Sequence, residues 1–138
     1  MKLGRIAGVA AASAALVLTV ANSAVAADHT MHTGDAWGNV PGVDWSGTGY
    51  FNEYGDVVTI CDKDADGYAV RMDVRLNDTS GPREYAFSVG GEGNCATKKA
   101  SMGSTYNLPE GKYIGFRFCR WKNDAESECN GYRFLNDH

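Results

Sequence analysis

Between Tyr68 and Leu76 every second residue is apolar, and the residues between them are Ala, Arg or Asp. A period of two places alternate side chains on opposite faces of an extended strand. This segment therefore predicts a strand whose apolar face lies in a core and whose other face, which carries Asp73, lies in solvent. After the first 26 residues no segment keeps a helical period of 3.6 for three turns, so we expect an all-β protein.

The same alternation recurs in shorter segments. Further strands are predicted at Gly49–Asn52, Val57–Cys61, Tyr85–Val89, Cys95–Ser101, Ile114–Phe118 and Tyr132–Leu135. Gly, Asp and Asn, which favour turns, stand between them. About seven short strands at this spacing are typical of an antiparallel β-sandwich, with an open barrel as the alternative. We expect one β-sandwich domain over residues 48–138, because a chain of 138 residues has little room for a second domain.

Residues 1–26 have the pattern of a secretory signal peptide. Cations at positions 2 and 5 precede an apolar run over residues 6–20, and residues 24–26 are Ala-Val-Ala, a pattern that signal peptidases cleave. We expect cleavage after Ala26 and a secreted, extracellular protein. No second apolar run is long enough to span a bilayer, so a membrane-embedded mature protein is not expected.

The charge balance is acidic. The chain has 13 Lys and Arg against 17 Asp and Glu, a net charge of −4. The predicted signal peptide contains Lys2 and Arg5 and no acid, so the mature chain would be more acidic still. Negative charge repels the phosphate backbone, and we therefore do not expect nucleic acid as a partner.

Four cysteines in an exported chain predict two disulfides, because the extracellular environment is oxidising and a small domain gains from cross-links. Three pairings are possible. We favour Cys61–Cys95, which would tie neighbouring strands, and Cys119–Cys129, which would close a short polar loop at residues 123–128. No cysteines form a C-x-x-C pair, so neither a zinc site nor a redox centre is indicated.

Residues 27–47 are rich in Gly and Asp and show little periodicity, which predicts an extended N-terminal arm. The apolar residues that we single out in it are Trp37, Val40, Val43 and Trp45. Tryptophan is costly to leave in water, so each indole should fold back over the sandwich or anchor in a partner. Trp45 adjoins the first predicted strand and could cap the core. Trp37 lies further out, and a segment that orders on binding would explain it.

Alternating carboxylates mark one loop. Asp62, Asp64 and Asp66 precede Gly67, a pattern that begins some calcium-binding loops. A glycine-closed turn between two strands explains the same residues without an ion. The flanking segments are also predicted strands, where the helical calcium loop needs helices. We therefore expect no metal and no cofactor, and calcium at these carboxylates is the less favoured interpretation.

Common catalytic signatures are missing from the sequence. The histidines are His29 and His32 in the predicted arm and His138 at the last position. There is no G-x-S-x-G or H-E-x-x-H motif, and two disulfides would leave no free cysteine. We therefore expect a protein that is not an enzyme.

Three stretches carry a resemblance to known proteins. Residues 54–62 read Tyr-Gly-Asp-Val-Val-Thr-Ile-Cys-Asp, and residues 65–67 read Ala-Asp-Gly before the long alternating strand. Residues 116–120 then read Phe-Arg-Phe-Cys-Arg. Over most of residues 48–135 this resembles the small secreted two-disulfide β-sandwich proteins of filamentous actinobacteria. Within that group, the size, the disulfides and the arm are similar to the adaptor subunit of umbrella toxin particles.

That resemblance implies an adaptor function. In the family, a small sandwich protein joins a lectin-bearing subunit to the repeat-bearing subunit of the toxin. Its N-terminal segment inserts into a cleft of a degenerate trypsin-like domain. Residues 27–47 would be that segment here, so we expect other secreted proteins as partners and a role for Trp37 in binding them.

Two other classes of protein share export, small size and disulfides. A secreted peptidase inhibitor would present the loop between Cys119 and Cys129 to a protease. A calcium-dependent carbohydrate-binding sandwich would use Asp62, Asp64 and Asp66 together with exposed aromatic side chains.

Overall fold

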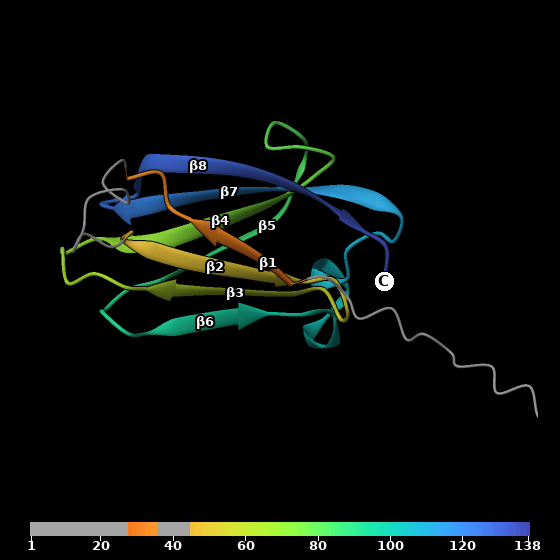
Figure 1. Cartoon of the computed structure of the whole chain (residues 1–138), viewed down its shortest axis with the longest axis horizontal. Coiled ribbons are helices and arrows are strands. Elements are labelled where there is room, and N and C mark those ends of the chain that lie inside the picture. The colour runs from red at the N-terminus through yellow and green to blue at the C-terminus, as the bar shows by residue number, and fades with distance from the viewer. Residues whose placement is uncertain (1–27, 36–44) are drawn as a thin grey trace, which may run out of the picture.

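Two four-stranded antiparallel sheets make up the protein in a computed structural model that describes residues 28–35 and 45–138 (Figure 1). The first sheet has the order β1 (Asp28–His32), β2 (Gly47–Asn52), β3 (Val57–Asp62) and β6 (Cys95–Lys98). The second sheet has the order β5 (Arg83–Val89), β4 (Ala69–Leu76), β7 (Lys112–Lys122) and β8 (Ala125–Asn136). The predicted antiparallel sandwich is confirmed, and the predicted signal peptide lies outside the described residues.

The two sheets pack through their inward side chains. Val70, Met72 and Val74 of β4 have no exposed surface, as the alternation predicts. Phe116 of β7 meets Phe51 of β2 across the interior, with 4.9 Å between ring centroids. Each such side chain contributes about 1.5–3 kcal/mol when it is buried, so this core is the main source of stability.

The predicted arm contains a strand of the sandwich. β1 pairs with β2 along its whole length, from Asp28 opposite Asn52 to His32 opposite Thr48. Met31 is fully buried in the core. The prediction of an extended arm over residues 27–47 is therefore wrong for β1. The sequence of β1 does not show alternation of apolar and polar residues, because its inward residue His29 is polar.

The free edge of β1 is attached to the second sheet. The Tyr132 hydroxyl of β8 accepts a hydrogen bond from the His32 amide at 2.9 Å and donates one to the His32 carbonyl at 3.2 Å. Two residues after the end of β1, the Gly34 amide donates a hydrogen bond to the Glu128 carbonyl of β8 at 2.7 Å. These bonds satisfy backbone groups that an edge strand would otherwise expose.

Both predicted disulfides are confirmed. Cys61 of β3 is bonded to Cys95 of β6, the residue directly opposite it in the sheet. Cys119 of β7 is bonded to Cys129 of β8, beside a shift in the register of these two strands. Each disulfide therefore joins neighbouring strands within one sheet.

The polar loop predicted at residues 123–128 is a β-hairpin. β7 continues to Lys122 and β8 begins at Ala125. Between them, Asn123 and Asp124 have φ values of 51° and 58°. Two residues with positive φ form the tight turn that suits the twist of paired strands, and Asn and Asp tolerate this conformation. The disulfide thus braces a hairpin and does not close an irregular loop.

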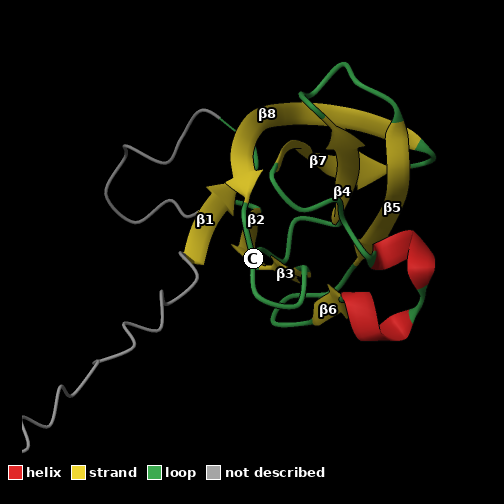
Figure 2. Ribbon diagram, turned by 90° about the vertical axis from the view of Figure 1, so that its right-hand side faces the viewer, coloured by secondary structure: helices red, strands yellow, loops and turns green. Residues whose placement is uncertain are grey.

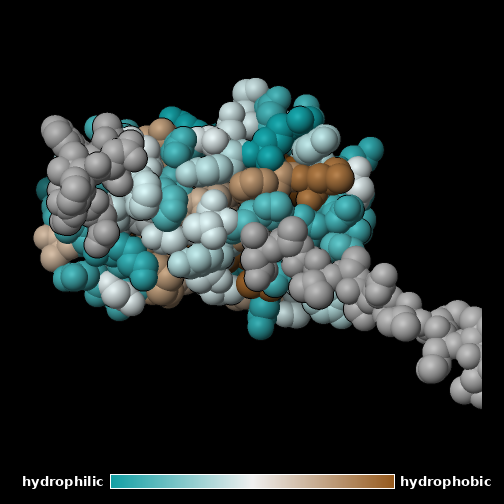
Figure 3. All heavy atoms as spheres, in the orientation of Figure 1, coloured by the Kyte–Doolittle hydropathy of each residue, from teal (hydrophilic) through white to brown (hydrophobic). Residues whose placement is uncertain are grey.

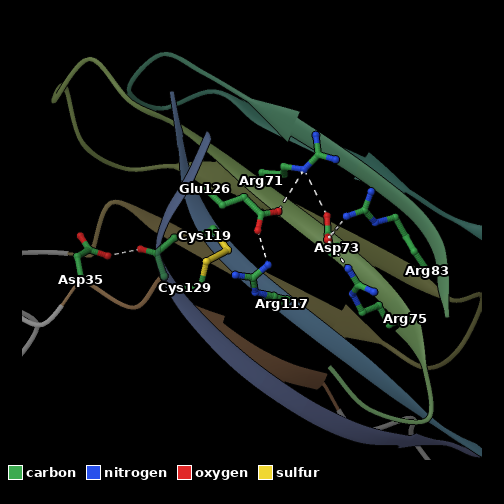
Figure 4. The surroundings of a disulfide bond; sticks show 10 residues. Asp35, Arg71, Asp73, Arg75, Arg83, Arg117, Cys119, Glu126 and Cys129 are labelled. Carbon is green, nitrogen blue, oxygen red and sulfur yellow. Dashed lines mark hydrogen bonds and ion pairs between the residues drawn. A yellow bond between two sulfur atoms is a disulfide. The ribbon is translucent and has the colours of Figure 1, made fainter. Parts of the chain in front are cut away.

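Asp73 was predicted to face solvent, and this is wrong. It has no exposed surface, although it lies on the outer face of the second sheet. Figure 4 shows the arginines that cover it: Arg83 at 2.7 Å, Arg75 at 3.1 Å and Arg71 at 3.3 Å from its carboxylate oxygens. The alternation identified the correct face, but long neighbouring side chains bury the carboxylate there.

A buried carboxylate also closes one end of the sandwich. Asp56 in the β2–β3 turn accepts hydrogen bonds from the Leu108 amide and from the Asn136 side chain, each at 2.9 Å. Burial raises the pKa of Asp56, and these two hydrogen bonds partly offset the effect. Nearby, two short 3-10 turns, η1 (Ala100–Met102) and η2 (Ser104–Tyr106), lie beside β5 and β6 (Figure 2).

The packing of β1 predicts that Met31→Ala destabilises the protein. Deleting a fully buried methionine side chain should lower the free energy of unfolding by about 2–5 kcal/mol. The matched control is Thr30→Ala, which changes an exposed neighbour on the same strand and should have little effect. Urea unfolding measures both variants, and equal midpoints would show that β1 is not part of the core.

Candidate interaction surface

Trp45 lies on the outer face of the first sheet, just before β2. Its ring is half-buried and stacks on His32 of β1, with 3.8 Å between ring centroids and 16° between ring planes. The interpretation that Trp45 caps the core is therefore wrong, because the indole packs against the outer face of β1 and not against the core. One face of the ring is covered by an imidazole of the same sheet.

Trp45 borders a pocket of about 390 Å³, which we call the Trp45 pocket. It is lined by Thr30, His32, Trp45, Thr48, Tyr50 and Lys63. The pairing of β1 with β2 explains how these residues meet, since Thr30 lies opposite Tyr50 and His32 lies opposite Thr48. Alternate residues of two paired strands share a face, so four of the lining residues project outward together.

The surroundings of His32 disfavour its charged form. Burial lowers the pKa of its imidazole, and the negative charge of Asp35 opposes this shift only in part. Its Nδ1 atom is buried and has no hydrogen-bond partner among the residues that the structure describes. An uncharged imidazole stacked on Trp45 adds aromatic surface to the pocket.

The two chain segments that lead to residues 36–44 are joined by hydrogen bonds between Asp35 and Ser46, which is next to Trp45 in the chain. The Asp35 carboxylate accepts hydrogen bonds from the Ser46 amide at 2.8 Å, from the Ser46 hydroxyl at 2.7 Å and from the Thr33 hydroxyl. Burial works to raise the pKa of Asp35, but these hydrogen bonds outweigh it and the pKa is lowered. The predicted binding residues Trp37, Val40 and Val43 lie outside the described residues.

The carboxylates proposed for calcium already have protein partners. Asp62 accepts hydrogen bonds from the amides of Asp64 and Gly91, at 3.2 and 2.8 Å. Asp66 accepts one from the Tyr68 amide at 2.9 Å and pairs with Arg120 at 2.9 Å. Both carboxylates therefore stabilise the turn between β3 and β4, and Asp62 attaches this turn to the loop between β5 and β6 whereas Asp66 attaches it to β7. Asp64 lies in the same turn, where its backbone amide donates the hydrogen bond to Asp62.

A second group of exposed apolar side chains lies on the opposite sheet. Tyr113 of β7 and Leu135 of β8 are directly paired, and they are 43% and 39% exposed. The Arg133 guanidinium stacks over Tyr113 at 3.6 Å from the ring centroid. The face of the molecule in Figure 3 is mainly hydrophilic or of intermediate hydropathy, with apolar residues in short strips.

Sequence reasoning found Trp45 but missed the rest of the pocket. The sequence does not identify four lining residues as part of one site, because the strand β1 is not recognised in it: Thr30, His32, Thr48 and Tyr50. The signal that could have found them is that Thr30 and His32, like Thr48 and Tyr50, are two residues apart, so each pair shares one face of a strand. It becomes informative only when the register of β1 against β2 is known.

The fold and the surface define a small antiparallel β-sandwich with two disulfides within its sheets and an aromatic pocket on one outer face. The comparison with protein-family models found no match, and the comparisons with curated proteins and with solved structures found no significant match either. None of the helices in the described part of the chain is long and apolar enough to cross a membrane.

The lowered pKa of His32 predicts a pH-dependent stability. The unfolded chain binds this proton more readily than the folded protein, so stability should fall as the pH drops below the usual histidine value of about 6.5. Thermal melts at about pH 7.5 and about pH 5.5 should show a smaller loss for His32→Gln than for the unchanged protein. Equal losses would mean that His32 is not desolvated.

Proposed function

We propose that the protein is a secreted, non-catalytic protein-binding module that acts as an adaptor between subunits of an extracellular complex. The observation that carries this proposal is the Trp45 pocket. Trp and Tyr are enriched among the residues that dominate binding energy in protein interfaces. Here a half-buried Trp45 and a 42% exposed Tyr50 flank one concave site on a rigid sheet.

The arrangement of the two outer faces supports a role with two partners. The Trp45 pocket lies on the outer face of the first sheet, and the Tyr113–Leu135 pair lies on the outer face of the second. Because the sheets pack face to face, these surfaces point away from each other, and two proteins could bind without contact between them. Simultaneous binding of two proteins is what an adaptor requires.

The region around the pocket also supports a contribution from the predicted arm. Residues 36–44 connect Asp35, whose charge acts on the pocket residue His32, with Trp45, which lines the pocket. In our proposal, Trp37, Val40 and Val43 bind the same partner as Trp45. The resemblance to adaptor subunits of umbrella toxin particles suggests a toxin complex as the assembly, and the two disulfides suit an oxidising, extracellular environment.

The two alternative classes draw less support from the geometry. A peptidase inhibitor would need an exposed binding loop, whereas Cys119 and Cys129 enclose paired strands and a two-residue turn. A calcium-dependent carbohydrate-binding protein would need free carboxylate oxygens, whereas Asp62 and Asp66 accept hydrogen bonds from the chain.

The proposal predicts that Trp45→Ala removes one partner. The purified protein should capture a specific secreted protein from the culture medium of its own source, and mass spectrometry identifies it. With that partner purified, Trp45→Ala should weaken binding by about 2 kcal/mol or more, a typical hot-spot effect. The matched control is Tyr54→Ala, because Tyr54 is 78% exposed but does not line the pocket.

A different partner, bound through the second sheet, should still be captured by Trp45→Ala. Equal binding of the first partner by Trp45→Ala and Tyr54→Ala would contradict the assignment of the pocket. Inhibition of a peptidase, or calcium-dependent binding to a polysaccharide, would instead favour one of the alternative classes.

A further inference from the structure

A cluster of potential metal ligands lies at one end of the sandwich. Glu53 follows the end of β2, and Asp137 and His138 follow the end of β8. One ligand atom from each of these three side chains lies within 4.8 Å of the others. Residues more than eighty positions apart in the sequence therefore meet because β2 and β8 end at the same edge of the fold.

Glu53 is a buried carboxylate with little positive charge near it. The residue is only 5% exposed. Its ion-pair partner is His29, whose Nε2 lies 2.7 Å from its Oε1. Among the described residues no Lys or Arg lies within 4.0 Å of the Glu53 carboxylate. A buried carboxylate is costly unless a cation compensates it, so this end of the sandwich favours the binding of a positive ion.

Further carboxylates increase the negative charge at the same end. Burial, together with the negative charges of Asp56, Asp137 and Glu53, raises the pKa of Glu110, although His138 acts in the opposite direction. Asp56 is only 1% exposed, and its hydrogen-bond donors are the uncharged groups of Leu108 and Asn136. A bound divalent cation would supply the positive charge that compensates the carboxylates at this end of the sandwich.

His29 is placed to orient Glu53 rather than to compete for an ion. Its ring stacks on Phe134 of β8, with 4.0 Å between ring centroids and 12° between ring planes. This packing fixes the imidazole on the inner face of β1 while its Nε2 contacts Glu53. A ligand carboxylate that is hydrogen-bonded from behind by a fixed side chain is typical of protein metal sites.

From this geometry we propose that Glu53, Asp137 and His138 bind a divalent first-row metal ion of the Zn²⁺ class, with His29 positioning Glu53. One imidazole and two carboxylates match the ligand preferences of Zn²⁺ better than those of Ca²⁺, which takes six to eight oxygen atoms. A second cluster of ligand types among the described residues, Cys119, Glu126 and Cys129, is not a comparable site, because both sulfur atoms are in a disulfide.

The test is calorimetric titration of the purified protein with Zn²⁺ and, separately, with Ca²⁺. We expect one Zn²⁺ per chain and much weaker binding of Ca²⁺. His138→Ala should weaken Zn²⁺ binding about tenfold or more, as loss of a ligand or its direct support does. His138 is exposed, so this variant should keep its fold. The matched control is His32→Ala, which removes an imidazole from the Trp45 pocket and should leave the affinity unchanged.

A second variant tests the buried ligand. Glu53→Gln should also weaken Zn²⁺ binding about tenfold or more, and a thermal melt without metal verifies that the variant is folded. Absence of Zn²⁺ binding would overturn the proposal, as would full affinity in His138→Ala or an equal loss in His32→Ala. Capture of a protein through the Trp45 pocket does not depend on these ligands, so the two proposals can fail separately.

Discussion

The packing of Phe51 against Phe116 joins two sheets that no disulfide connects. Cys61–Cys95 lies within the first sheet and Cys119–Cys129 within the second, so apart from the loops of the chain the attachment of one sheet to the other is noncovalent. It depends on the inward faces of the strands and on a few polar contacts at the edges, such as that of Tyr132 with β1. The inward faces are therefore committed to the core, and the outer faces remain for binding.

β1 shows how one short strand can serve the core and both proposed sites. Its inward residues are His29, which contacts Glu53, and Met31, which is buried. Its outward residues are Thr30 and His32, which line the Trp45 pocket. Alternation along five residues thus places a positioning group for the proposed metal site on one face and part of the proposed protein-binding site on the other.

Much of the sandwich could be predicted from the sequence, because strands with one buried face show their alternation directly. The long strand predicted between Tyr68 and Leu76, which is β4, and both disulfide pairings are examples. β1 was missed because its inward histidine reads as polar, and the burial of Asp73 was missed because three arginines converge on it only in the folded sheet. The Trp45 pocket and the Glu53 cluster join residues distant in the sequence, so the pairing of strands had to be known first.

The central claim is that no disulfide joins the two sheets, so that noncovalent contacts hold them together, and peptide mapping without reduction tests it most directly. The protein is digested with its disulfides intact, and the linked peptides are identified by mass spectrometry. We predict two linked pairs, Cys61 with Cys95 and Cys119 with Cys129. A peptide that links Cys61 to Cys119 would show a covalent bond between the sheets and would contradict the strand order on which both proposed sites depend.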